Sequence, residues 1–195
     1  IAANDAARPA VRRTRVRAGV VKVAGSEGGP SARDARAFEA AALAHRRTGV
    51  PILTHCENGT GALEQVRLLA DAGVDPGHVV LSHVDKVADA AYHREIAASG
   101  AVLEYDQAFR WGDRPNGTLD LLTTLAADGL TDRIVLGMDA ARQGYLRSYG
   151  GRPGLAFLLT EFSEEMEARG LDATIRQALF VENPARAFAF RTMEG

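Results

Sequence analysis

The chain has 195 residues, 46% of them hydrophobic, and a formal charge of −2 at pH 7. A chain of this length can bury a sizeable hydrophobic core. The near balance of acidic and basic residues argues against nonspecific electrostatic binding of nucleic acid. Cys56 is the single cysteine, which excludes an intrachain disulfide and a thiolate zinc knot. No apolar run reaches membrane-spanning length. We therefore expect a cytoplasmic protein that binds neither nucleic acid nor membrane.

Apolar runs alternate with amphipathic stretches along the whole sequence. They predict strands near residues 20–24, 51–55, 79–83, 101–105 and 134–138, and helices near 31–48, 61–72, 87–99, 118–128, 155–169 and 172–179, with a short helix from 184. Ser31 is the expected N-cap of the first helix because Asp34 follows three residues later, and Gly49 is its expected stop. Near-continuous apolar strands between helices are typical of an α/β protein with a parallel sheet covered on both faces. We expect one domain over residues 1–195.

Four strand-like runs, over residues 18–22, 50–55, 78–83 and 134–139, each end on a residue that can bind a metal ion. The residues are Lys22, His55, His83 and Asp139. Because the carboxyl ends of parallel strands lie side by side, we expect the four side chains to converge. Each one alone has a structural interpretation, such as a strand-end lysine or a helix cap. Their ordered repetition favours a hydrolytic metal centre.

The number of strands leaves two architectures open. Five βα units are fewer than the eight of a closed barrel, so an open doubly wound sheet is an alternative. The glycine patterns that bind nucleotides in such sheets are absent from the sequence.

Several short motifs resemble, in order, the second half of the phosphotriesterase family, a branch of the amidohydrolase superfamily of metal-dependent TIM barrels. They occupy residues 21–26 (VKVAGS), 53–57 (LTHCE), 81–85 (LSHVD), 137–139 (GMD), 146–151 (LRSYGG) and 182–186 (ENPAR). The last two also look like the phosphotriesterase homology proteins. The resemblance implies a TIM (β/α)8 barrel of the metal-dependent hydrolase type, with only about strands 4–8 present here. Residues 1–17 would then be the end of a preceding helix and its loop.

The resemblance also implies roles for the four residues. Two divalent ions, usually zinc, would activate a bridging hydroxide that attacks a phosphoester, lactone or related ester. Lys22 would bridge the ions as a carbamate formed with carbon dioxide, which suits an amine that has lost ammonium character by desolvation. His55 and His83 would bind the second ion. Asp139 would bind the first ion and act as the catalytic residue that accepts a proton from the hydroxide.

Two departures from the family pattern bear on activity. The His-x-His pair of the family's first strand has no counterpart, because His45 and His93 fall in expected helices and His78 opens a strand. After Asp106 the phosphotriesterase branch has a histidine and the lactonase branch an arginine, whereas this chain has Gln107. This substitution argues against efficient organophosphate hydrolysis and against the acyl-lactone branch.

Substrate specificity in this fold lies in the loops after strands seven and eight. These loops supply Gln107, Arg110, Trp111 and Arg142 as candidate substrate-binding residues. Arginine suits an anionic group such as a phosphate or a carboxylate. We expect a small-molecule ester or phosphoester as the substrate, and we consider a homodimer as the assembly.

Other functions remain open. A nucleophilic pair of Cys56 and His55 is disfavoured because neighbouring side chains on a strand point to opposite faces. A TatD-type deoxyribonuclease is disfavoured because that group has a glutamate where Lys22 stands. A truncated, catalytically inactive family member that acts as a binding or accessory protein stays open, because three absent strands would leave unpaired edges. We therefore expect the natural protein to be longer than this sequence, or the missing segment to be disordered or cut away.

Overall fold

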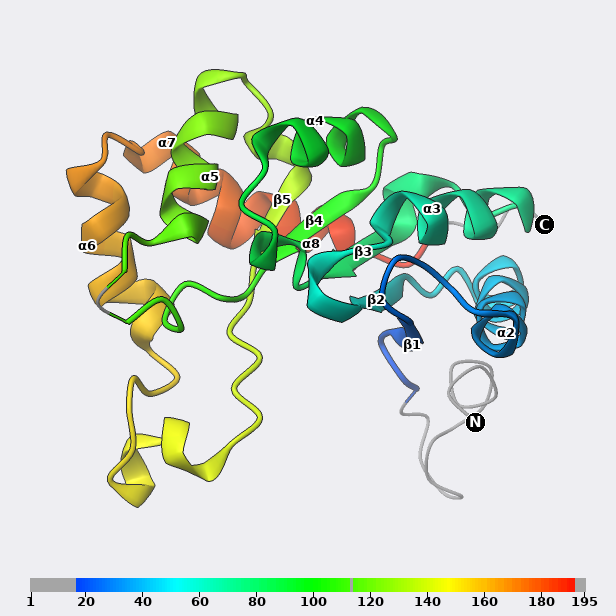
Figure 1. The fold of residues 1–195 in the computed structure, drawn as a ribbon, viewed down its shortest axis with the longest axis horizontal. Helices are drawn as coiled ribbons and strands as arrows, with labels where there is room; N and C mark the ends of the chain where they lie inside the picture. Colours follow the sequence, from blue (N-terminus) through cyan, green and yellow to red (C-terminus); the bar gives the residue numbers. More distant parts are fainter. Residues whose placement is uncertain (1–16, 113, 192–195) are drawn as a thin grey trace.

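Five parallel strands form one sheet in the sequential order β1-β2-β3-β4-β5 (Figure 1). The computed structural model describes residues 17–112 and 114–191. The strands are Val21–Gly25 (β1), Ile52–Cys56 (β2), Val79–Ser82 (β3), Val102–Tyr105 (β4) and Ile134–Leu136 (β5). The predicted strands are thus confirmed, with shifts of one or two residues at their ends. The helix end and loop predicted for residues 1–17 fall almost wholly outside the described residues.

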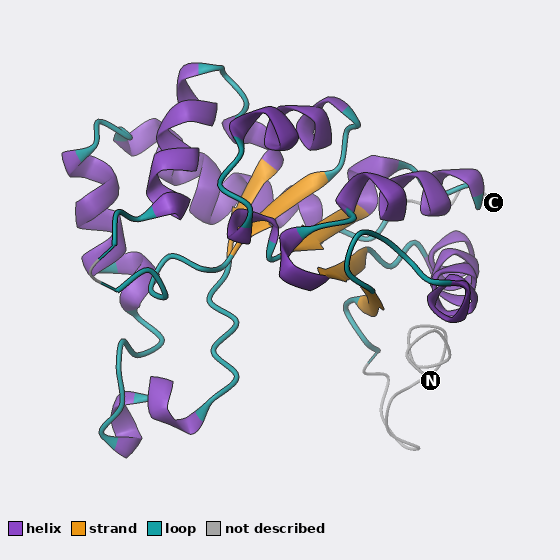
Figure 2. Cartoon of the chain, in the orientation of Figure 1, coloured by secondary structure: helices purple, strands orange, loops and turns teal. Residues whose placement is uncertain are grey.

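Helices connect successive strands, and those between β1 and β5 cover one face of the sheet (Figure 2). They are α2 (Ala32–Thr48), α3 (Ala62–Asp71), α4 (Ala90–Ala98) and α5 (Gly117–Ala127), followed after β5 by α6 (Glu161–Ala168), α7 (Ala173–Gln177), a π-helical turn (Ala178–Glu182) and α8 (Asn183–Ala187). None of the described helices is both long and apolar enough to cross a membrane.

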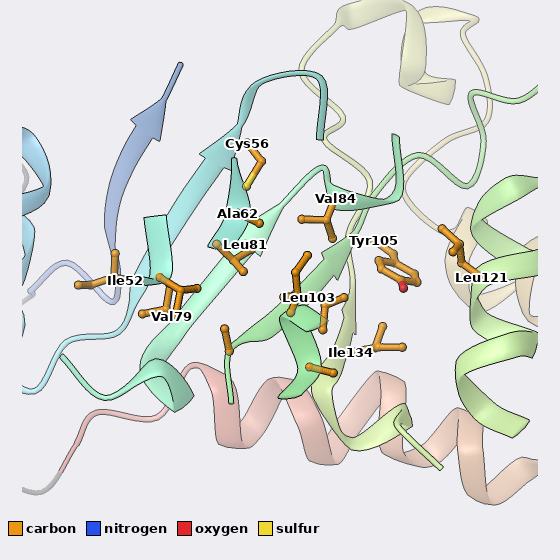
Figure 3. Close-up of a cluster of buried hydrophobic side chains, with 14 of the residues drawn as sticks. Ile52, Cys56, Ala62, Val79, Leu81, Val84, Leu103, Tyr105, Leu121 and Ile134 are labelled. Atoms are coloured by element: carbon orange, nitrogen blue, oxygen red, sulfur yellow. The ribbon is translucent and has the colours of Figure 1, made fainter. Parts of the chain in front are cut away.

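The main core lies between the sheet and helices α2 to α5. Ile52, Leu81, Leu103 and Ile134 are fully buried on this face of their strands. Figure 3 shows them in one cluster with Cys56 and Tyr105. Because successive side chains alternate between faces, this packing determines which residues face the other way.

The opposite face of the sheet carries the candidate site. A smaller cluster of Val80, Val102 and Val135 packs there against Ala187 of α8. Nearer β1, Lys22 is exposed. The prediction of a sheet covered on both faces is therefore wrong at β1, where buried and exposed residues alternate along the strand.

The predicted helix over residues 155–169 is broken in two. A single 3₁₀ turn, Phe157–Leu159, comes before α6, and Thr160 between them has non-helical dihedral angles (φ −117, ψ −101). Its hydroxyl donates to the Ala156 carbonyl at 3.0 Å. Such side-chain bonds to the local backbone compete with helix formation. The segment between β5 and this turn projects away from the sheet (Figure 1).

Candidate active site

The predicted metal ligands lie at or near the carboxyl-terminal edge of the sheet. His55 lies near the end of β2, His83 directly follows β3, and Asp139 follows β5. The rings of His55 and His83 are in contact, with centroids 4.6 Å apart and planes at 74°. The sheet thus brings together two imidazoles that are far apart in the sequence.

Lys22 lies inside β1 rather than at its end, which corrects the prediction from the sequence. The strand continues to Gly25 because its residues pair in register with β2 as far as Cys56. The amine nitrogen Nζ reaches across the sheet and donates to the Thr54 carbonyl at 3.0 Å and to Ser82 Oγ at 2.9 Å.

Burial of the amine lowers the pKa of Lys22, and the carboxylate of Glu104 opposes this effect. The residue as a whole is exposed, yet its amine is part-buried against β2 and β3. Only the amine nitrogen carries the charge, so its burial, and not the exposure of the whole side chain, sets the direction in which the pKa changes. It favours the neutral amine that carbamate formation needs.

His83 has an unusual backbone and a buried ring nitrogen beside a carboxylate. Its φ is 70°, in the left-handed region that costs non-glycine residues free energy. Its Nδ1 lies 2.5 Å from Asp106 Oδ2. Nδ1 is buried and makes no hydrogen bond of regular geometry with the described residues, and its close polar contact is the Asp106 carboxylate. A nitrogen in this condition is suited to bind a metal ion.

His55 has an acidic neighbour that sequence reasoning did not single out. Its Nε2 lies 2.9 Å from Glu57 Oε2, and this hydrogen bond lowers the pKa of Glu57. Glu57 begins a short 3₁₀ turn directly after β2. A signal was present in the sequence, since an acid stands two residues after a candidate ligand.

Asp139 is paired with Arg110. Nη2 of Arg110 donates to the Asp139 carbonyl at 2.6 Å and to its carboxylate Oδ2 at 2.9 Å. The guanidinium also lies over the Phe109 ring, 4.7 Å from its centroid. A predicted ligand and a predicted substrate-binding residue are therefore in direct contact.

The donor set fits part of a two-metal centre. In residues 17–112 and 114–191, no three His, Cys, Asp or Glu side chains lie close enough to hold one ion. The imidazoles of His55 and His83 do adjoin, and Nδ1 of His83 is buried beside the Asp106 carboxylate, a pair of groups that could both bind one metal ion. The predicted convergence is thus found only in part, because Arg110 holds the Asp139 carboxylate.

Asp85 is fully buried below the site and accepts three hydrogen bonds. The donors are the backbone N–H groups of Asp106 and Gln107 and the hydroxyl of Thr118. Burial and the nearby charge of Asp106 raise the pKa of Asp85 to about 6. This arrangement could not be predicted from the sequence, because Thr118 is distant from Asp85 along the chain.

The four predicted substrate-binding residues lie in different surroundings. Arg110 and Trp111 line a cavity of about 680 Å³ between the loops that follow β4 and β5. Gln107 is buried, and its side-chain amide donates to Asp106 Oδ1. Arg142 is exposed and lines neither this cavity nor the smaller ones described.

Cys56 is turned away from His55, as strand alternation predicts. It is fully buried in the core on the helix-covered face. Burial raises the pKa of its thiol to about 12. A nucleophile needs the thiolate, so the geometry argues against a pair of Cys56 and His55.

Comparison with known proteins agrees with this geometry. A sequence profile of the phosphotriesterase family matches residues 5–188. The phospho-furanose lactonase of Mycoplasmopsis synoviae is 33% identical over 189 residues, covering 93% of this chain and 54% of that protein. The phosphotriesterase homology protein of Escherichia coli is 33% identical over 177 residues, covering 90% and 60%. The chain thus spans little more than half the length of these relatives.

Solved structures give the same result. A crystal structure of the Escherichia coli phosphotriesterase homology protein, with phosphate in its active site, has a TM-score of 0.89 at 30% identity, covering 96% of this chain and 64% of that one. A lactonase from Listeria monocytogenes has a TM-score of 0.89 at 29% identity, covering 97% and 59%. The five-stranded sheet is therefore part of a (β/α)8 barrel, corresponding to about strands 4–8, as predicted. The chain belongs to the phosphotriesterase family.

Proposed function

We propose that the chain belongs to a metal-dependent hydrolase that cleaves an ester bond in a small anionic molecule such as a lactone or a phosphoester. The observation that carries this proposal is the contact between the rings of His55 and His83 at the sheet edge, with the buried Nδ1 of His83 beside the Asp106 carboxylate. Relatives described as a phospho-furanose lactonase and an aryldialkylphosphatase support a hydrolase.

The ligands we assign are those at the sheet edge. His55 and His83 would hold one divalent ion, Asp139 would hold a second, and Lys22 would bridge them after its amine adds to carbon dioxide and releases a proton. Zinc suits imidazole and carboxylate ligands. When bound, the two ions supply an activated water and polarise the oxygen under attack.

The remaining residues would bind and orient the substrate. Arg110 contacts the Asp139 carboxylate and also lines the large cavity, so an anionic group held there lies close to the ligand set. Asp139 Oδ2 would accept the proton released during attack. Trp111 supplies an apolar wall of the same cavity.

A second candidate is a catalytically inactive binding or accessory protein. It is favoured by the pairing of Arg110 with the carboxylate of Asp139, which occupies one of the predicted metal ligands.

The test is hydrolysis by the purified protein, loaded with zinc, cobalt or manganese, of phosphorylated lactones, neutral lactones, phosphoesters and an N-acetyl amide. The N-acetyl amide is included because another relative is described as an N-acetyltaurine hydrolase. We expect turnover of an anionic ester or lactone that stops on chelation and returns with added metal. Turnover that resists chelation would contradict metal dependence. No turnover of any substrate by metal-loaded protein would favour the inactive binding protein.

A further inference from the structure

The hydroxyl of Thr118 links two side chains from different loops. Thr118 is buried at the start of α5. Its Oγ1 donates to Asp85 Oδ2 at 2.6 Å and accepts from Trp111 Nε1 at 3.0 Å. An indole N–H can only donate and a carboxylate can only accept. The direction is therefore fixed, from Trp111 through Thr118 to Asp85.

The carboxylate of Asp85 ties both ends of one loop to the turn after β3. It accepts the N–H groups of Asp106 at 3.2 Å and Gln107 at 2.9 Å, where the loop leaves β4. Thr118 follows the other end of the loop. Hydrogen bonds to a carboxylate are strong, and a buried donor that loses its partner is costly.

Gly117 leaves room for the indole. A Cβ at this position would lie 2.6 Å from Cζ2 and from Cη2 of Trp111. The residue is helical, a conformation in which alanine is otherwise preferred to glycine. Arg114 lies over the indole ring, 5.4 Å from its centroid. The position of the indole is thus determined by its hydrogen bond, by the α5 backbone and by a cation.

Trp111 lines two cavities beside the candidate site. One, of about 680 Å³, also has Arg110 and Tyr145 in its lining. The other, of about 180 Å³, also has Lys86 and Gln107. A shift of the indole would therefore change the shape of both.

We propose that Asp85 and Thr118 are positioning residues that set substrate specificity without touching the substrate. They hold Trp111 and the start of its loop, residues 106–112, in the shape that forms the cavity wall. The effect on substrate rests on the proposed hydrolase function. The effect on the position of Trp111 does not.

The first test is the fluorescence of Trp111, the single tryptophan in this chain. Thr118→Val removes the hydroxyl at nearly constant volume, and Thr118→Ser keeps it. We expect a red-shifted emission and stronger acrylamide quenching in T118V, and values like those of the unchanged protein in T118S. Gly117→Ala should move the indole by a different route, with the same shift. If T118V does not fold, the fluorescence of G117A still tests whether the position of Trp111 is fixed in this way.

The second test is kinetic, on the substrate that the unchanged protein turns over best. We expect T118V to raise KM about fivefold to tenfold, the equivalent of one lost hydrogen bond, with kcat and metal content unchanged, and T118S to restore KM. Equal quenching in T118V, G117A and the unchanged protein would overturn the positioning role. A fluorescence shift with no change in KM would overturn the specificity role. Without any turnover the proposed function fails, and the fluorescence still decides the positioning role.

Discussion

His83 and Asp139 share a backbone feature that fits a functional site. Their φ angles are 70° and 43°, and only Asn58 joins them as a non-glycine residue with positive φ among the described residues. Such a conformation costs roughly 1–2 kcal/mol for a residue with a Cβ, and residues of this kind cluster at active sites. Two of the four predicted ligands thus carry local backbone strain.

The first prediction concerns the thiol of Cys56. We expect iodoacetamide to leave Cys56 unmodified in the folded protein at mildly alkaline pH, because the thiol is buried and its pKa is raised to about 12. Mass spectrometry should show full alkylation once the protein is unfolded. Rapid alkylation of the folded protein would show that Cys56 is accessible and ionised, and would reopen the interpretation as a nucleophile.

At the scale of the element, α2 begins with a complete capping box. The backbone N–H of Asp34 donates to Ser31 Oγ at 3.3 Å, and the backbone N–H of Ser31 donates to Asp34 Oδ2 at 2.9 Å. Loss of such a cap by Ser31→Ala should lower the free energy of unfolding by about 1 kcal/mol. Urea denaturation measures this loss. A value equal to that of the unchanged protein would contradict the assigned cap.

The same cap should be sensitive to pH. Hydrogen bonds from Ser26 and Ser31 lower the pKa of Asp34 from 3.8 to about 2. A carboxylate with a lowered pKa in the folded state stabilises the protein above its unfolded value, and this contribution is lost as pH falls toward the folded value. Asp34→Asn should therefore destabilise the protein at neutral pH, and the difference should shrink between about pH 4 and 2. Glu39→Gln, at an exposed position of the same helix, is the control that should show no such trend.

Local signals explain which elements the sequence could predict. The residues that cap α2 are close neighbours in the chain, so Ser31 and Gly49 were found from their spacing. The end of β1 depends on pairing with β2, which lies outside the local sequence. The prediction therefore placed Lys22 at the end of the strand, whereas it lies inside β1. At the break, the Thr160 hydroxyl donates to the Ala156 carbonyl, and a pattern of apolar residues at helical spacing does not reveal this hydrogen bond.

The site residues also divide into those fixed by regular strand geometry, which the sequence could predict, and those fixed by contacts between distant loops. His55, His83 and Asp139 could be placed at the sheet edge because parallel strands align their carboxyl ends. The pairing of Arg110 with Asp139 and the hub at Asp85 could not be predicted, since each joins side chains about thirty residues apart through loops of irregular shape.

At the scale of the whole molecule, the C-terminal segment closes the amino-terminal side of the sheet. Asn183 Nδ2 donates to the Thr131 and Ile134 carbonyls, each at 2.7 Å. The chain then runs to Arg191, whose N–H donates to the Gly49 carbonyl at 2.8 Å. The end of the described chain thus joins the start of β5 to the end of α2.

Gly49 tests whether this closure contributes to stability. Its φ is 72°, and a Cβ there would lie 2.2 Å from the Arg191 carbonyl oxygen. Gly129 is a matched control, with φ 73° and nothing within 4 Å. Both alanine variants should lose about 1 kcal/mol from backbone strain, and Gly49→Ala should lose more. Equal losses in thermal denaturation would contradict docking of the C-terminal segment.

The measurement that tests the central claim most directly is divalent metal content per chain, by elemental analysis alongside intact mass. The account predicts about two ions per chain in the unchanged protein, a clear loss in His83→Asn, and no loss in His78→Asn, whose imidazole lies at the opposite end of β3. No bound metal in the unchanged protein, or equal loss in both variants, would contradict a metal centre at His83.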